Sequence, residues 1–137
     1  MSANNDLKKQ IRQHQSFVEE ILSVSKKIFQ HSVELDLTLL VHEVGNRQRM
    51  INILEFLQRQ IEKKIDAFKP EDINQEIYDA LLNWRTFTSE KINKIERFDH
   101  KIVESLSKNQ DEISKEIASL FRQRDLFRGY DLSSVKR

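Results

Sequence analysis

The chain has 137 residues, of which 33% are charged and 38% hydrophobic, with two glycines, one proline and no cysteine. The lack of cysteine excludes disulfides and cysteine-ligated zinc sites, and it is typical of proteins in a reducing compartment. Basic and acidic residues number 23 and 22 and are finely interspersed, so the sequence lacks the basic surface that binds duplex nucleic acid. We therefore expect no nucleic-acid partner.

The N-terminal residues are polar and are followed by no apolar run of signal-peptide or membrane-spanning length. We expect a cytoplasmic protein with no membrane insertion. The length suits one domain, so residues 1–137 are predicted to form a single helical domain.

The first predicted helix covers residues 5–31. Asn4 or Asn5 can cap its free backbone N–H groups. Its core-facing residues recur three or four positions apart, which is the period of one helix face. They are Leu7, Ile11, His14, Val18, Ile21, Ser25 and Ile28. Phe17, Leu22 and Phe29 widen this stripe, which favours packing against two partner helices.

The second predicted helix covers residues 36–68 and is capped by Ser32 or Asp36. Its stripe consists of Leu40, Val44, Arg47, Ile51, Leu54, Gln58, Ile61, Ile65 and Phe68. Gly45 lies inside this helix and costs about 1 kcal/mol relative to alanine. The glycine is either a weak point in the helix or a place where another backbone approaches closely.

The third predicted helix covers residues 70–128, with Pro70 at its first position and Phe68 against Ile73 as a hydrophobic staple. No glycine or proline interrupts it before Gly129, the expected C-terminal cap, so 129–137 is predicted to be a mobile tail. If continuous, this helix is roughly 85 Å long. Its stripe includes Ile77, Leu81, Trp84, Ile95, Phe98, Ile102, Leu106, Ile113, Ile117, Leu120 and Phe127.

Short connections require neighbouring helices to be antiparallel. The predicted fold is therefore all-α: an elongated antiparallel three- or four-helix bundle with a long C-terminal helix. The last helix outruns its partners by about 30 Å, and this part is apolar. Three arrangements are open: a break near 107–111 that folds the chain back as a fourth helix, pairing with a second copy as a homodimer, or a surface for another protein. Asn109 and Glu112 have the spacing of a capping box for the first arrangement.

We find no catalytic or metal-binding pattern and expect a protein that is not an enzyme and needs no cofactor. The sequence has no glycine-rich phosphate loop, no cysteine nucleophile and no serine–histidine–acid order that a helical hairpin would assemble. His42 is followed four residues later by Asn46, so the zinc-protease pair of histidines is missing. His14 and His31 are interpreted as boundary or surface residues.

Two segments carry a resemblance to a known family. Residues 122–130, RQRDLFRGY, end a long amphipathic helix with basic residues, a leucine and a glycine before tyrosine. Residues 35–40, LDLTLL, are followed by Glu43, Arg47 and Ile51. The chain thereby resembles the flagellar type III export chaperones of the FliT and FlgN group, in which a leucine-rich turn precedes an acid–arginine stretch.

The resemblance implies a cytoplasmic chaperone that holds a late flagellar subunit, either a filament cap or a hook–filament junction protein, before export. A helical segment of this protein client would bind the apolar residues of the C-terminal helix. These residues are Ile113, Ile117, Leu120, Phe121, Leu126 and Phe127. Tyr130 would contact a component of the export gate. The alternative is a structural coiled-coil bundle, or a helical adaptor or signalling protein, with no export role.

Overall fold

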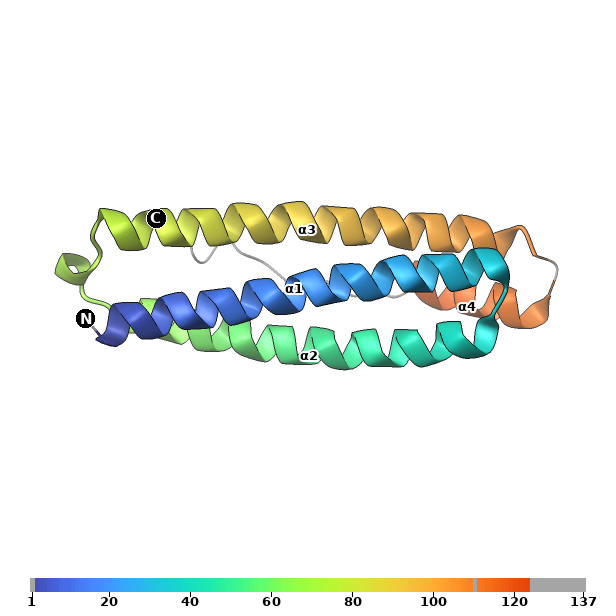
Figure 1. Ribbon diagram of the computed structural model, residues 1–137, viewed down its shortest axis with the longest axis horizontal. Helices are drawn as coiled ribbons and strands as arrows, with labels where there is room; N and C mark the ends of the chain where they lie inside the picture. The colour runs from blue at the N-terminus through green and yellow to red at the C-terminus, as the bar shows by residue number, and fades with distance from the viewer. Residues whose placement is uncertain (1, 110, 124–137) are drawn as a thin grey trace.

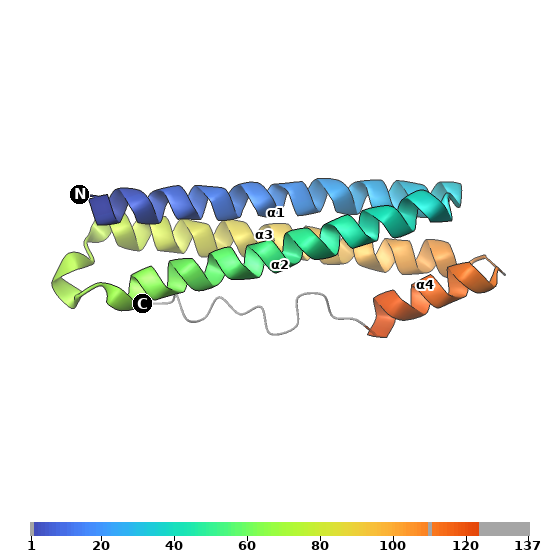
Figure 2. The same ribbon diagram turned by 90° about the horizontal axis from the view of Figure 1, so that it is seen from below.

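The apolar stripes of the sequence form helices in the computed structural model, which describes residues 2–109 and 111–123. Three long helices lie side by side with alternating direction, and a short fourth helix turns back along the end of the third (Figures 1 and 2). The elements are α1 (Ser2–Glu34), α2 (Leu37–Ala67), the 3-10 turn η1 (Pro70–Asp72), α3 (Gln75–Ser107) and α4 (Glu112–Gln123). The prediction of an all-α helical bundle is confirmed.

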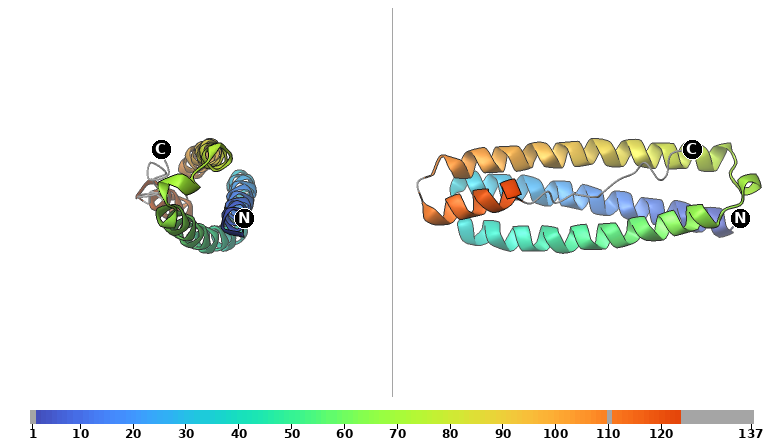
Figure 3. Two further views of the ribbon diagram at one scale, coloured as in Figure 1. Left: turned by 90° about the vertical axis from the view of Figure 1, so that its left-hand side faces the viewer. Right: turned by 180° about the vertical axis from the view of Figure 1, so that it is seen from behind.

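Helix α1 is the central element of the bundle. It packs along both α2 and α3, whereas α2 and α3 are less closely paired with each other, and in the end-on view of Figure 3 it lies between them. All seven residues of its predicted stripe are buried. Leu22 is buried as well, and Phe17 and Phe29 pack against the core, so the wide stripe does serve two partners.

The core is a narrow row of three apolar clusters along the bundle. The first includes Leu7, Ile61 and Trp84, and the second Val18, Ile51 and Ile95. The third cluster lies at the α1–α2 turn and contains Val24, Ile28, Leu40, Ile102, Leu106, Ile117 and Ala118. Burying each large aliphatic side chain contributes about 1.5–3 kcal/mol.

His14 is fully buried between these helices, so its interpretation as a boundary or surface residue is wrong. Its ring meets the Trp84 ring edge-on, with centroids 5.2 Å apart. The Trp84 indole N–H donates a hydrogen bond to His14 Nδ1 at 3.0 Å. The histidine is polar but satisfied, which explains how it occupies a stripe of apolar residues.

The turn between α1 and α2 uses a leucine where glycine is usual. Leu35 has a φ of 58°, in the left-handed region. The Asp36 N–H donates to the His31 carbonyl at 3.0 Å and the Leu35 N–H to the Ser32 carbonyl at 3.4 Å, which is the Schellman pattern. Asp36 then caps α2 by accepting a hydrogen bond from the Leu39 N–H at 3.3 Å.

Pro70 begins η1 rather than the third helix, which corrects the predicted start at residue 70. The helix begins instead at Gln75, because Asn74 is extended and its side chain accepts a hydrogen bond from the Ile77 N–H at 2.9 Å. An asparagine cap satisfies a free backbone donor, which proline at the first position does not do. Phe68 and Ile73, the expected staple, both pack against the first apolar cluster.

The long C-terminal helix predicted over 70–128 is not continuous, because α3 ends at Ser107. Polar side chains stabilise the break. Asn109 Oδ1 accepts a hydrogen bond from the Asp111 N–H at 3.1 Å, and Asp111 Oδ1 accepts one from the Ile113 N–H at 2.7 Å. Asp111 therefore caps α4, in place of the expected Asn109–Glu112 pair. The chain takes the fold-back arrangement, the first of the three that the sequence left open.

None of the described helices contains a stretch that is long and apolar enough to cross a membrane.

Candidate functional site at the seat of α4

Helix α4 lies against the end of the bundle that contains the α1–α2 turn (Figure 1). Ile117 and Ala118 are 7% and 1% exposed and belong to the third apolar cluster, against which Phe121 also packs. The Arg122 guanidinium donates a hydrogen bond to Ser107 Oγ at 2.6 Å and so ties α4 back to the end of α3. One face of α4 is therefore part of the core.

A second face of α4 is exposed. Ile113 and Leu120 are 55% and 54% exposed, and their separation of seven residues places them on the same side of the helix. The six predicted client-binding residues are thus divided. Ile117 and Phe121 point into the bundle, Ile113 and Leu120 face outwards, and Leu126 and Phe127 lie outside the described residues, as does Tyr130.

The α1–α2 turn at the same end of the bundle also exposes large apolar side chains. Val33, Leu35 and Leu39 are each close to half exposed, and Leu35 occupies its strained left-handed position without being buried. A large apolar residue that is both strained and exposed gains nothing from the core. Sequence reasoning missed these residues, although the leucine-rich segment 35–40 was the available signal.

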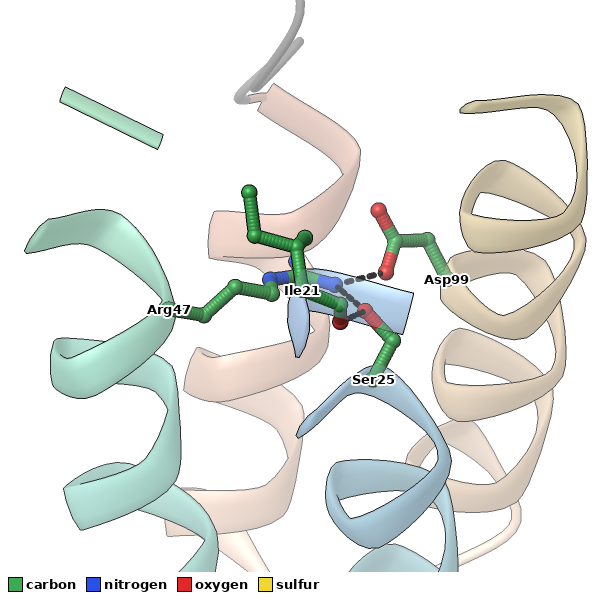
Figure 4. Close-up of polar contacts among 4 residues, drawn as sticks. All are labelled: Ile21, Ser25, Arg47 and Asp99. Carbon is green, nitrogen blue, oxygen red and sulfur yellow. Dashed lines mark hydrogen bonds and ion pairs between the residues drawn. The ribbon is translucent and has the colours of Figure 1, made fainter. Parts of the chain in front are cut away.

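Beneath α4, a buried arginine links the three long helices (Figure 4). Arg47 of α2 is fully buried. Its Nη1 donates hydrogen bonds to Ser25 Oγ of α1 at 2.8 Å and to Asp99 Oδ1 of α3 at 2.7 Å. Ser25 in turn donates to the Ile21 carbonyl at 2.8 Å. The arginine therefore fixes the relative positions of α1, α2 and α3 directly under the fourth helix.

The rest of the Arg47 guanidinium faces less polar surroundings. Its Cζ lies 5.5 Å from the centre of the Phe121 ring of α4, a cation–π distance. Its Nε and Nη2 atoms are buried without a hydrogen-bond partner among the described residues. Buried donors without acceptors are destabilising by about 1–3 kcal/mol each, so this junction is a costly place in the core.

The pKa of the Asp99 carboxyl group is raised above its ordinary value, although two kinds of effect act on it in opposite directions. Burial raises the pKa of its carboxyl group, while the positive charge of Arg47 and the hydrogen bond from it act to lower that pKa. A buried ion pair contributes little net stability but is strongly destabilising when one partner is removed. The Arg47–Asp99 pair is therefore expected to add little net stability, whereas loss of either side chain alone would leave an uncompensated charge and destabilise the bundle.

Histidine and carboxylate side chains are not clustered in the described part of the chain. In residues 2–109 and 111–123, no group of three histidine, aspartate or glutamate side chains is placed to hold a metal ion. The sequence put Arg47 on a core stripe but did not identify Ser25 and Asp99 as its partners. A charged residue at a core position was the signal, because arginine is rarely fully buried unless it is paired.

Comparison with known protein families, with curated proteins and with solved structures gives no match for this chain. The fold and the site together define an all-α helical bundle whose short fourth helix is partly core and partly exposed.

Proposed function

We propose that the protein is a cytoplasmic export chaperone, not an enzyme, that binds a helical segment of a late flagellar subunit. The client would be a filament cap or hook–filament junction protein. The observation that carries the proposal is the outward face of α4, where Ile113 and Leu120 are both more than half exposed. Two large apolar side chains one heptad apart are the kind of anchors with which an amphipathic helix binds another helix.

Further support comes from the surroundings of α4 and from the sequence resemblance. The exposed Val33, Leu35 and Leu39 at the α1–α2 turn extend the apolar character of this end of the bundle. The resemblance to the FliT and FlgN group rests on residues 122–130 and 35–40. The same resemblance supports delivery of the client to the export gate through Tyr130.

The experiment is a calorimetric titration of the purified chain with a filament cap or hook–filament junction protein. Replacing Ile113 and Leu120 together with glutamate should weaken binding by about 2 kcal/mol or more, the range of an interface hot spot. Ile117 is unsuitable for this test, because its burial means that a charge there would disrupt the core. Circular dichroism should show unchanged helicity.

The matched control replaces Ile53 and Phe56 of α2 with glutamate. These side chains are 44% and 52% exposed, so the control alters a similar amount of exposed apolar surface at a different place. Client affinity should be retained. Equal losses in both double variants, or no binding by the parent chain, would contradict the proposed site. Dimers that depend on Ile113 and Leu120 would favour the structural coiled-coil alternative.

A further inference from the structure

A pocket lies between α1 and α3, and no residue of α2 or α4 lines it. Its volume is about 450 Å³. The charged residues that line it are Glu19, Lys26, Lys91, Lys94, Arg97 and Lys101. The pocket is therefore separate from the surface on which α4 packs, and it lies between a different pair of helices.

The pocket concentrates positive charge in a chain that is almost neutral. Five cations face one carboxylate here, whereas the whole chain has 23 basic and 22 acidic residues. Lys91 lies 3.8 Å from Glu19 Oε1, and Lys26, Lys94, Arg97 and Lys101 form no ion pair with any described residue. Unbalanced charge in a concave site raises the local concentration of oppositely charged ligands.

Aromatic rings hold two of the lysines in place. Lys101 Nζ lies 5.8 Å from the centre of the Phe29 ring and 5.5 Å from that of Phe98. Lys91 Nζ lies 5.3 Å from the centre of the Phe87 ring. Cation–π contacts restrict these long side chains before any ligand arrives, which reduces the entropy lost on binding.

The shape of the pocket distinguishes among anionic ligands. The cations of α3 recur at positions 91, 94, 97 and 101, along one side of the helix over about 15 Å. That length matches a short peptide segment. A membrane-binding helix would place exposed apolar side chains beside these cations, whereas here Leu22 is buried and Phe98 is half-buried. Duplex nucleic acid is bound through many phosphates on a broader basic surface. Leu22 and Phe98 add apolar lining, against which an aliphatic side chain can pack.

We propose that this pocket binds an acidic segment of a partner protein, whose aspartate or glutamate carboxylates pair with the lysines and Arg97. The segment lies along α3, and an apolar residue of the segment packs on Leu22 and Phe98. This interaction goes beyond the proposed chaperone function and does not depend on α4. A failure of client binding at α4 would leave it unaffected.

The test uses the full chain and fluorescence anisotropy with a short labelled peptide of glutamate and leucine at helical spacing. The acidic peptide should bind, with an affinity that falls as salt is raised, and the same peptide with glutamine for each glutamate should not bind. Lys94→Glu together with Arg97→Glu should weaken binding by roughly tenfold or more, because like charges would then face each other. Both residues are exposed, so the fold should be retained.

The matched control is Arg59→Glu with Lys63→Glu, which makes the same change of net charge on exposed positions of α2. It should change the affinity by no more than about twofold, since only screened long-range repulsion is altered. Equal losses in the two double variants would overturn the pocket assignment, and so would no binding by the parent chain. Tighter, pocket-dependent binding of a thymidine oligonucleotide or of phosphatidylserine vesicles would overturn the choice of an acidic protein segment.

Discussion

At the scale of single residues, the core of this bundle contains a titratable group that is held neutral. Burial lowers the pKa of His14 from 6.5 to about 4, and a side-chain hydrogen bond with Gln58 acts in the opposite direction. The indole N–H of Trp84 only donates, so Nδ1 must be the acceptor and carries no proton in the neutral ring. Protonation at Nδ1 would break that hydrogen bond.

This environment predicts a stability that falls in mild acid. As the pH drops below 6.5, His14 takes up a proton in the unfolded chain but not in the folded one until about pH 4. The unfolded state therefore binds more protons in this window, and the free energy of unfolding decreases by up to about 3 kcal/mol. Urea denaturation at a series of pH values would measure the change.

The comparison variant is His14→Gln, which keeps a hydrogen-bond acceptor near Trp84 but does not titrate. The carboxylates of the chain titrate in both proteins, so the difference between their two pH profiles isolates His14. The variant should show a shallower loss of stability between pH 6.5 and 4. Parallel profiles would show that His14 has the same proton affinity in the folded and unfolded states.

At the scale of elements, the interior of α2 contains a glycine, Gly45, that lowers helix stability without a packing reason. A Cβ atom built at Gly45 would have Arg49 Nη1 as its nearest neighbour, at 3.9 Å, which is ordinary contact. No backbone approaches closely enough to require glycine. Of the two interpretations of Gly45 offered by the sequence, the structure favours the weak point.

Gly45→Ala should therefore stabilise the protein by about 0.5–1 kcal/mol, because alanine loses less backbone entropy in a helix. Thermal or urea denaturation would measure the increase. Gly45→Pro serves as the contrast and should cost about 3 kcal/mol or more, since proline removes a helical hydrogen bond. A destabilising alanine would mean that another part of the chain needs the space at Gly45.

The helical faces could be predicted from the sequence, whereas the helix ends could be predicted only in part. Asp36 caps α2 as expected, but α1 begins at Ser2, before the predicted caps Asn4 and Asn5, and α3 begins and ends at other residues than predicted. The free energies of burying the many apolar side chains of a stripe add up, so a spacing of three or four residues was sufficient to place Leu54 or Ile102 in the core. The breaks depend on single capping side chains worth about 1 kcal/mol each. Asn74 and Asp111 provide the capping side chains at two of these breaks. At a third, Leu35 adopts a left-handed conformation that sequence rules assign to glycine.

The candidate site was predictable only in part for the same reason. Residues 113, 117 and 120 continue the stripe of α3 in the sequence, and nothing in that spacing shows which of them face inwards after a fold-back. The break re-orients α4, so that Ile117 enters the third cluster while Ile113 and Leu120 face outwards. The Arg47–Asp99 pair joins residues 52 positions apart, a separation that periodicity along one helix does not report.

At the scale of the whole molecule, the bundle is organised around α1, and α4 is its least supported helix. Helix α1 packs along both α2 and α3, whereas α4 makes its main helix contact with α3. Helix α4 has 12 residues, against 33 in α1, and isolated helices of that length are marginal in water. Its anchoring depends on Ile117, Ala118 and part of Phe121.

These differences predict that α4 opens separately from the rest of the bundle. Native-state hydrogen exchange across a series of low denaturant concentrations should show amides of α4 exchanging at a free energy well below that of global unfolding. The buried stretch of α1 from Val18 to Ile28 should exchange only with global unfolding, because its residues contact two helices throughout.

Ile117→Ala should lower the opening free energy of α4 by about 2–5 kcal/mol, or abolish its protection, and leave the α1 amides less affected. Leu120→Ala is the matched change on the exposed face and should alter the opening free energy of α4 far less, since that side chain is 54% exposed. If α4 and α1 amides exchange at the same free energy in the parent chain, the four helices unfold as one unit, and the fold-back is an integral part of the core.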